Sequence, residues 1–330
     1  MGGPVGPSSG GRSVGADLCG IGDLEDVELA EILGHALALR ELPSLPEVLR
    51  GRQIVAAFAE PSTRTRMSFQ AAARRLGADV VAFDGGASTS ASKGESALDA
   101  LQNLDAMGFD AFVVRDRRQG WARRLRGELR ARVINAGDGI GEHPTQALLD
   151  AATILEVFGR SAAEGKNSLK GLRIAICGDI LHSRVAGSDL RLLPRLGASV
   201  VAAGPPGLID PAALPSSVDF AESLDQALVG ADVIMMLRVQ RERLPVALEL
   251  PDDVSYHTRW GLSVPRLGLA KAGAIVLHPG PMNRGVEIAS EVADGPRSRI
   301  LLQAHLGVAV RMAVLARACG RQNLLPRAHP

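Results

Sequence analysis

The stretch Phe58-Ala59-Glu60-Pro61-Ser62-Thr63-Arg64-Thr65-Arg66 lies where an apolar run gives way to an amphipathic one. Residues 54–58 form the apolar run, which is typical of a buried strand, and residues 64–76 carry apolar side chains at helical spacing. Hydroxyl and guanidinium groups therefore gather where a strand becomes a helix. Because the first N–H groups of a helix lack partners and its dipole is positive there, this junction can hold an anion such as phosphate. The alternative is an ordinary helix cap at Ser62, with the arginines in solvent.

The alternation of strand and helix continues on both sides of this junction. Apolar runs predict strands over 54–58, 80–83, 111–114, 133–135, 173–177, 199–203, 233–237 and 274–277. Helical spacing predicts helices over 23–39, 64–76, 96–107, 121–129, 144–158, 184–196, 224–229, 264–272 and 300–318. This order is typical of α/β proteins, in which helices cover both faces of a parallel sheet.

The polar segment 160–170 interrupts the alternation, so we expect two doubly wound parallel-sheet domains of similar architecture. Ligands in such folds bind beyond the carboxyl ends of the strands and between domains, which predicts an active site in the cleft between the two sheets. We expect a flexible tail rich in Gly, Ser and Pro over 1–18, a first domain over 19–150 and a second over 151–299. The helix at 300–318 is expected to pack back on the first domain.

The composition excludes several classes of function. Of the 330 residues, 46% are hydrophobic and 22% charged, as in a soluble globular protein with a large core. A net charge of +1 and an aromatic content of 3% argue against nucleic acid and anionic membranes as partners. No uninterrupted run of about 18 apolar residues predicts a membrane span. Cys19, Cys177 and Cys319 are far apart and form no disulfide or metal pattern, which favours a reducing cytoplasm.

Further polar groups stand at the expected ends of strands in both halves. They are Arg115, His143, Arg184, Arg238 with Gln240, and the turn His278-Pro279-Gly280-Pro281. Each has a structural alternative: a surface ion pair with Asp116, a helix cap, a solvated helix start, a solvated charge run over 241–243, or a rigid turn. Their repetition at the same end of both sheets favours a shared site.

The side chains at these positions point to one kind of chemistry. The sequence has no serine elbow, no catalytic cysteine–histidine neighbourhood and no metal-ligand spacing, and Gly178-Asp179 lacks the full glycine pattern of dinucleotide binding. Cations, amides, hydroxyls and one well-placed histidine suit a reaction in which the protein positions two anionic reactants and stabilises developing negative charge. The small polar segment 85–96 is either a surface loop or a mobile loop that delivers Lys93 and a hydroxyl to an anion.

Taken together, these segments resemble the aspartate carbamoyltransferase family over about residues 23–318. The segments that carry the resemblance are 58–66, Ser92-Lys93-Gly94-Glu95-Ser96, Asn135-Ala136-Gly137-Asp138-Gly139, His143-Pro144-Thr145-Gln146, Arg238-Val239-Gln240 and 278–288, in the family's order. The resemblance implies transfer of the carbamoyl group of carbamoyl phosphate to the amine of L-aspartate, in pyrimidine biosynthesis, with no cofactor and no metal. It makes 19–150 the carbamoyl-phosphate domain and 151–299 the aspartate domain.

The resemblance also implies a role for each candidate residue. The carbamoyl-phosphate site would consist of Ser62, Thr63, Arg64, Thr65, Arg115, His143 and Gln146, with Arg64, Thr65, Arg115 and His143 acting in catalysis. The aspartate site would consist of Lys93, Arg184, Arg238, Gln240, Pro279 and Gly280. In the family Thr89, Ser90 and Lys93 come from the adjacent subunit, which implies a homotrimer with shared sites. Dihydroorotase and a regulatory chain are further partners of this family, which a single sequence does not specify.

Within this implied site, His143 would donate to the carbonyl oxygen and Gln146 would contact the carbamoyl amide. Arg184 would hold the α-carboxylate of aspartate, and Arg238 with Gln240 its side-chain carboxylate. Backbone carbonyls of Pro279 and Gly280 would orient the amines.

Two positions depart from the family's pattern. Asp116 follows Arg115 where a neutral or basic residue is common, and it would weaken the local positive field. Gln70 stands where the family usually has Glu, which removes an ion pair of a structural kind.

Two other functions stay open at this point. An ornithine carbamoyltransferase shares the phosphate half, but an arginine at 238 repels a cationic side chain and attracts a carboxylate, which favours aspartate. A non-catalytic relative would serve as a structural partner in a larger assembly. Such relatives usually lose residues of the phosphate cradle, whereas Ser62 to Thr65, Lys93 and His143 are all present.

Overall fold

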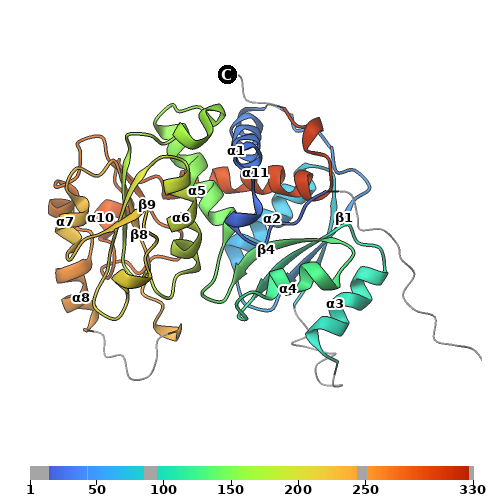
Figure 1. Ribbon diagram of the computed structural model, residues 1–330, viewed down its shortest axis with the longest axis horizontal. Coiled ribbons are helices and arrows are strands. Elements are labelled where there is room, and N and C mark those ends of the chain that lie inside the picture. Colours follow the sequence, from blue (N-terminus) through green and yellow to red (C-terminus); the bar gives the residue numbers. More distant parts are fainter. Residues whose placement is uncertain (1–14, 43, 85–94, 244–250, 327–330) are drawn as a thin grey trace, which may run out of the picture.

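The computed structural model of the chain describes residues 15–42, 44–84, 95–243 and 251–326. Two parallel sheets lie side by side, one in each half of the chain, with helices on both faces (Figure 1). This arrangement confirms the expected α/β class with two doubly wound sheets. It follows from the alternation of short apolar runs with amphipathic segments, because a parallel strand can be reached only through a crossover that packs on the sheet.

The first sheet has the strand order β2-β1-β3-β4. Its strands are β1 (Gln53–Phe58), β2 (Asp79–Phe83), β3 (Ala111–Asp116) and β4 (Arg132–Asp138). The helices of this half are α1 (Asp26–Glu41), α2 (Thr63–Arg75), α3 (Ala97–Ala106), α4 (Trp121–Glu128) and α5 (Pro144–Val157). Phe58 pairs with Arg115, so β1 and β3 end at the same level of the sheet and their following loops meet there.

Successive residues of β1 face opposite sides of this sheet, as the pleat of a strand requires. Ile54, Ala56 and Phe58 belong to a core with side chains of α2, α5 and α11 (Ile300–Ala318). Val55 and Ala57 belong to a second core with side chains of α3 and α4. Because both faces are covered, the strand reads as a continuous apolar run rather than an alternating one.

The second sheet has the order β7-β6-β5-β8-β9 and is parallel throughout. Its strands are β5 (Arg173–Cys177), β6 (Ser199–Ala203), β7 (Val218–Phe220), β8 (Val233–Met236) and β9 (Ile275–Leu277). Its helices are α6 (Arg184–Arg195), α7 (Leu224–Leu228), α8 (Asp253–Trp260), α9 (Val264–Leu267) and α10 (Ser290–Ala293). Short 3₁₀ helices lie at Ile21–Asp23, Ala162–Asn167, Pro211–Ala213, Arg241–Arg243 and Gln322–Leu324.

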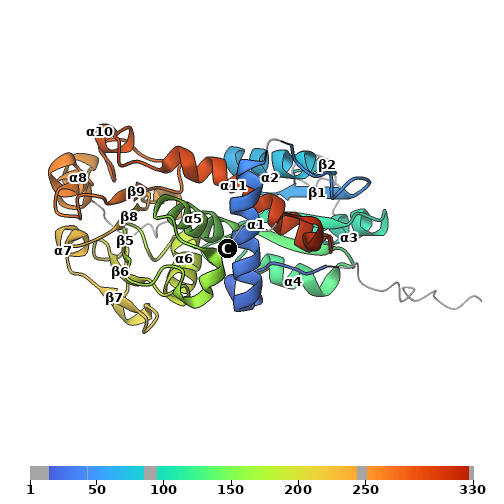
Figure 2. The same cartoon turned by 90° about the horizontal axis from the view of Figure 1, so that it is seen from above.

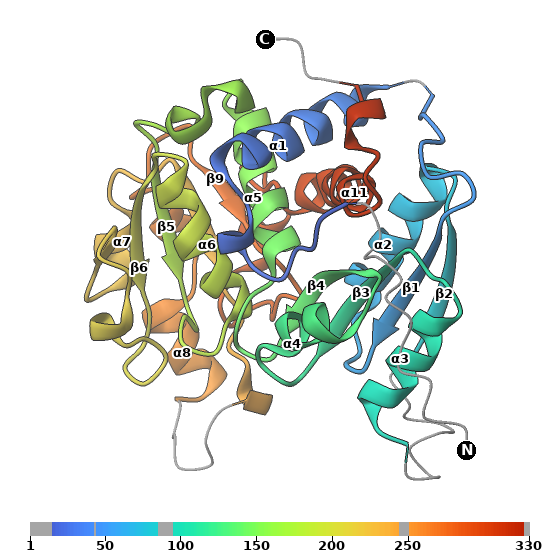
Figure 3. The same cartoon turned by 45° about the vertical axis from the view of Figure 1, so that its right-hand side comes forward.

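Helix α11 follows the second half in the chain and packs on helices of the first half. It contacts α1, α2 and α5, and Figure 2 shows it crossing α1 between the two sheets. In Figure 3 it is seen almost end-on beside α1 and α2. By length and composition α11 is the one described helix apolar enough to cross a membrane, but 67% of its most apolar window is buried inside the protein. Its hydrophobicity is therefore that of a core helix.

Several elements, most of them in the second half, were not predicted or were predicted with wrong bounds. Strand β7 escaped prediction because it is a three-residue edge strand with one buried side chain. Helix α8 buries only Tyr256 and α10 has four residues, so neither carries a helical apolar pattern. The helix expected over 264–272 ends at Leu267, where the chain turns at Gly268. Strand β4 continues past Asn135 to Asp138, which brings that glycine-containing segment into the sheet.

Candidate active site

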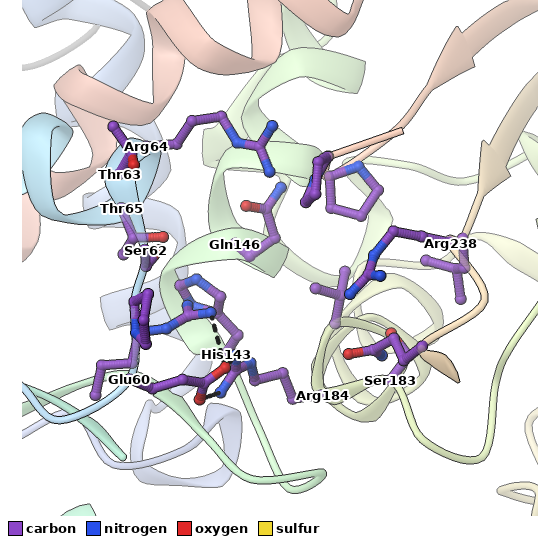
Figure 4. A pocket seen from close by; sticks show the side chains of 18 of the residues that line it. Glu60, Ser62, Thr63, Arg64, Thr65, His143, Gln146, Ser183, Arg184 and Arg238 are labelled. Atoms are coloured by element: carbon purple, nitrogen blue, oxygen red, sulfur yellow. Dashed lines mark hydrogen bonds and ion pairs between the residues drawn. The ribbon is translucent and has the colours of Figure 1, made fainter. Parts of the chain in front are cut away.

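A pocket of about 450 Å³ lies between the carboxyl ends of the two sheets (Figure 4). Its lining includes twelve of the residues predicted from the sequence, namely Ser62, Thr63, Arg64, Thr65, Arg115, His143, Gln146, Arg184, Arg238, Gln240, Pro279 and Gly280. The three other predicted site residues, Thr89, Ser90 and Lys93, lie outside the described residues. The pocket is thus built by segments from both halves of the chain.

The start of α2 forms one wall. Ser62 is the N-cap residue, yet its side chain makes no capping bond to the helix, so its hydroxyl is not used as the ordinary-cap alternative requires. Arg64 has no carboxylate partner among the described residues. Burial and the nearby charge of Arg238 both lower the pKa of Arg64, which means that its charge is incompletely compensated. The helix start is therefore arranged for an anion that is not part of the chain.

Arg115 is the second-to-last residue of β3. Strand β3 lies next to β1, the strand that leads into α2. Its Nη1 donates to the carbonyl oxygen of Ala136 at 3.1 Å, and its Nη2 lies 3.5 Å from Glu60 Oε1. Burial and the like charge of Arg184 lower the pKa of Arg115 to about 9. The guanidinium is still charged at neutral pH, and the lowered pKa reflects first its burial and then the positive charge of Arg184.

His143 stands at the N-cap of α5, and Pro144 occupies the first helical position. Its side chain is 4% exposed and its backbone N–H donates to Ser188 Oγ at 3.0 Å. The ring Nδ1 is buried without a hydrogen-bond partner. Burial, followed by the charges of Arg115, Arg311 and Arg184, holds the pKa of His143 well below its usual range. The imidazole is therefore neutral at physiological pH and can donate one N–H without carrying charge.

The opposite wall comes from the second half of the chain. Arg184 opens α6, is 4% exposed and forms a bidentate pair with Glu60, with Nη1 to Oε2 at 2.9 Å and Nη2 to Oε1 at 2.8 Å. Arg238 and Gln240 follow β8 and line the same wall. Gln240 donates its backbone N–H to Asp179 Oδ2 and its Nε2 to the carbonyl oxygen of His182.

The turn after β9 closes the pocket near the start of α2. Gly280 has φ +64°, a conformation that favours glycine, and a Cβ at this position would lie 2.3 Å from Arg64 Nη1. Its backbone N–H donates to His278 Nδ1 at 2.8 Å, which fixes the turn. Glycine here lets the backbone pass directly beside the guanidinium.

Sequence reasoning missed two charged residues of the pocket, Glu60 and Arg243. Arg243 Nη2 lies 3.2 Å from Glu60 Oε1, whereas Arg241 pairs with Asp253 on the surface, so the run 241–243 is not a uniformly solvated one. The lone acid within the stretch 58–66 was the available signal for Glu60. Burial opposes its charge, but its bonds to Arg184 and the charges of Arg115 and Arg243 hold the pKa of Glu60 below its ordinary value.

The two departures from the family pattern lie outside the pocket lining. Asp116 pairs with Arg118 through Oδ1 to Nε at 2.8 Å and Oδ2 to Nη2 at 2.6 Å, and it also accepts the backbone N–H of Arg118. Its charge is thus matched by Arg118 rather than by Arg115. Gln70 is half-buried on α2 and lines no part of the pocket.

The lining carries five arginines and one carboxylate, Glu60, among the residues that the structure describes. This excess of positive charge on both walls suits a ligand set with several negative charges. Hydroxyls, the neutral His143 and the amide of Gln146 supply uncharged hydrogen-bonding groups between the two walls. The pocket can therefore hold a phosphate at one end, carboxylates at the other, and a polar reacting group between them.

The chain matches two known domain families in succession. Residues 16–156 match the family described as aspartate/ornithine carbamoyltransferase, carbamoyl-P binding domain. Residues 170–318 match aspartate/ornithine carbamoyltransferase, Asp/Orn binding domain.

Comparisons with whole proteins agree with these two domain matches. The chain is 49% identical over 305 residues to the aspartate carbamoyltransferase catalytic subunit of Granulibacter bethesdensis, covering 92% of this chain and 93% of the relative. It is 50% identical over 303 residues to that of Sorangium cellulosum, covering 90% and 91%. Similar solved structures include aspartate transcarbamoylase from Trypanosoma cruzi with carbamoyl aspartate and phosphate, at 30% identity and a TM-score of 0.78, covering 92% of this chain and 95% of that one. Ornithine carbamoyltransferase from Thermus thermophilus also has a TM-score of 0.78, at 27% identity, covering 94% and 99%.

Proposed function

The chain belongs to the aspartate/ornithine carbamoyltransferase family, and we propose that it transfers the carbamoyl group of carbamoyl phosphate to the amine of L-aspartate. The products are N-carbamoyl-L-aspartate and phosphate, an activity that belongs to pyrimidine biosynthesis. One observation carries the proposal: a single pocket combines the start of α2, where Ser62 makes no side-chain capping bond, with arginines from the second half of the chain. Such a pocket accepts a phosphate and a dicarboxylate at the same time.

In this proposal the phosphate of carbamoyl phosphate occupies the start of α2. It accepts from the side chains of Ser62, Thr63 and Thr65, and from backbone N–H groups of the first turn. Arg64 and Arg115 neutralise its charge, and Arg115 reaches toward the carbonyl oxygen. The like charges that lower the pKa of Arg64 and of Arg115 support this arrangement, because a bound phosphate would relieve the repulsion between these arginines and their cationic neighbours.

The aspartate would bind against the second half of the chain. Arg184 holds the α-carboxylate, and Arg238 with Gln240 holds the side-chain carboxylate, for which a planar guanidinium is well suited. Carbonyl oxygens of Pro279 and Gly280 accept from the amine of aspartate and from the carbamoyl NH₂, and so orient both.

The reaction follows from this placement. The amine nitrogen of aspartate attacks the carbamoyl carbon, and a new C–N bond forms as the carbonyl π electrons move to oxygen. Thr65, Arg115 and His143 donate to that oxygen and stabilise the tetrahedral intermediate. When the intermediate collapses, the bond from carbon to the phosphate oxygen breaks and phosphate leaves with a proton from the amine. A neutral His143 suits this role, since it donates a hydrogen bond without giving up its proton.

The choice between aspartate and ornithine rests on charge. Ornithine carries an ammonium on its side chain, and Arg238, with Arg243 nearby in the pocket lining, would repel it. The relatives at about 50% identity are named for aspartate, whereas the structural similarity alone extends to both kinds of enzyme.

The remaining expectations complete the proposal. Residues 19–150 together with α11 would bind carbamoyl phosphate, and 151–299 would bind aspartate. A homotrimer would supply Thr89, Ser90 and Lys93 from the neighbouring subunit to each site, and the enzyme would work in the cytoplasm.

The test is an assay of the purified chain with carbamoyl phosphate and either L-aspartate or L-ornithine. We expect N-carbamoyl-L-aspartate to form at least one hundred times faster than citrulline. Citrulline as the main product would support an ornithine enzyme, and the absence of both products would support a non-catalytic relative.

A further inference from the structure

A chain of buried hydrogen bonds runs behind the pocket, starting at Gln146. On α5, Gln146 Nε2 donates to Asp150 Oδ1 at 3.0 Å, one helical turn further along. Asp150 is 0% exposed and does not line the pocket. Gln146 itself does line the pocket, and its Oε1 has no protein partner among the described residues.

The same oxygen of Asp150 receives a second donor, from α11. Gln303 Nε2 donates to Asp150 Oδ1 at 2.6 Å, and Gln303 Oε1 accepts the backbone N–H of His278 at 2.9 Å. His278 in turn accepts the backbone N–H of Gly280 on its Nδ1. Hydrogen bonds therefore connect the carbamoyl side of the pocket with the turn that carries Pro279 and Gly280.

The backbone N–H of His278, at the far end of this series of hydrogen bonds, sets the direction of every bond in the series. A backbone N–H can only donate, so the amide of Gln303 must turn its oxygen to His278 and its NH₂ to Asp150. An oxygen of residue 150 must then accept, and the amide of Gln146 must also turn its NH₂ inward. The Oε1 of Gln146 is left facing the pocket, where the NH₂ of a carbamoyl group needs an acceptor.

We propose that Asp150 and Gln303 are positioning residues that hold Gln146 Oε1 toward the carbamoyl NH₂, an inference that rests on the proposed carbamoyl transfer. Neither residue touches substrate. Together they select the donor that carries an NH₂ group and keep the 278–281 turn aligned with it.

What Asp150 contributes is an acceptor oxygen rather than a charge. Both glutamine donors use Oδ1, and Oδ2 has no partner. Burial raises the pKa of Asp150, and the positive charge of Arg311 on α11 opposes that rise. Burial also raises the pKa of Asp189 on α6, whose two carboxylate oxygens have no hydrogen-bond partner among the described residues. An asparagine at 150 can place its oxygen at the Oδ1 position, and Gln303 would force it to do so.

The experiment compares carbamoyl phosphate with acetyl phosphate, in which a methyl group replaces the NH₂, at a fixed aspartate concentration. The readout is the ratio of kcat/KM for the two donors. We expect Asp150→Leu and Gln146→Leu each to lower this donor preference by about tenfold, because each loses the same acceptor for the NH₂. A purely structural defect lowers kcat/KM for both donors equally, and that result would overturn the proposal.

Asp150→Asn keeps the volume of the side chain, so it tests the proposal even if Asp150→Leu does not fold. We expect it to restore the donor preference. Adding Gln303→Leu to Asp150→Asn should remove the preference again, because the asparagine amide can then turn either way. A loss of preference in Asp150→Asn alone, or no effect of Gln303→Leu in that background, contradicts the inference. If the unmodified chain forms no carbamoyl aspartate at all, it is the proposed function that has failed.

Discussion

At the scale of single residues, His143 illustrates how position sets chemistry. The residue is held at the N-cap of α5 by Pro144 and by the bond of its N–H to Ser188, so its ring is fixed in the pocket wall. Burial among three arginines then keeps it uncharged. A charged imidazolium would repel Arg115, whereas a neutral ring can stand beside it and, in the proposed mechanism, stabilise the same developing oxyanion.

We predict that His143→Ala lowers kcat by about one hundred-fold or more, the usual effect of removing one oxyanion donor. The unfolding transition should remain cooperative, since the ring makes no side-chain hydrogen bond that the fold needs. Steady-state rates of phosphate release measure the effect. His305→Ala, at an exposed position outside the pocket lining, is the control. A His143→Ala enzyme with near-normal kcat would remove this residue from the mechanism.

Asp116 gives a second prediction, because its charge is used by Arg118 and by the backbone rather than by the pocket. Asp116→Asn should lower the free energy of unfolding by about 1–3 kcal/mol, since the negative charge is lost and an NH₂ group replaces one of the two oxygens that accept from Arg118. The affinity for inorganic phosphate should stay within about threefold of the original, the spread expected of interactions that do not reach the ligand. Calorimetric titration with phosphate checks this, and a clear gain in affinity would show that Asp116 does oppose the anion.

At the scale of elements, the end of β4 shows why glycine stands within the sheet. Gly137 has φ +115°, and a Cβ there would lie 3.0 Å from Arg184 Nε and 3.1 Å from Arg115 Nη1. The strand end therefore leaves room for one arginine from each half of the chain. This is a close approach that a larger residue would prevent.

Gly137→Ala should accordingly lower kcat/KM for aspartate by at least about tenfold, because displaced guanidinium groups lose their alignment. The substitution should also destabilise the fold by about 1–2 kcal/mol, the cost of a left-handed conformation for a residue with a Cβ. Gly127→Ala is the matched control, since a Cβ at that helical position meets nothing within 4 Å. Equal kinetics for the two variants would contradict the account.

The elements also show what a sequence can and cannot predict. The junction of β1 and α2 was predicted well because an apolar run, a polar turn and a helical pattern follow one another within about twenty residues. Strand β7 and helix α8 were missed because their stability comes from neighbours rather than from their own patterns. Local patterns thus predict elements that bury most of one face, and they fail for short edge elements.

At the scale of the whole molecule, Glu60 ties the two halves together across the pocket. It follows β1 of the first sheet and pairs with Arg184 and Arg243 of the second half, at sequence separations of 124 and 183. No local sequence pattern predicts such a pairing. The same is true of Asp150 and Gln303, which lie 153 residues apart. The residues that line the pocket could be predicted from strand ends, but the partners that orient them depend on the folded topology.

Glu60→Gln should therefore lower the free energy of unfolding by about 3 kcal/mol at neutral pH, because it leaves buried arginines without their counter-charge. Since the folded-state pKa of Glu60 lies below its unfolded value of 4.5, the difference between the two proteins is complete above that pH. It should shrink as the pH falls through the folded pKa. Urea unfolding at pH 7, 5 and 3.5 measures this. A difference that grows in acid would mean that the ion pairs are not its source.

The central claim is that one pocket holds a phosphate and a dicarboxylate together. Calorimetric titration with a bisubstrate analogue, a phosphonate joined through an amide to L-aspartate, tests it most directly. The account predicts one analogue per chain, bound at least about one hundred times more tightly than either half alone, with Arg64→Ala and Arg238→Ala each removing most of that gain. An analogue that binds no more tightly than its phosphonate half would contradict the claim.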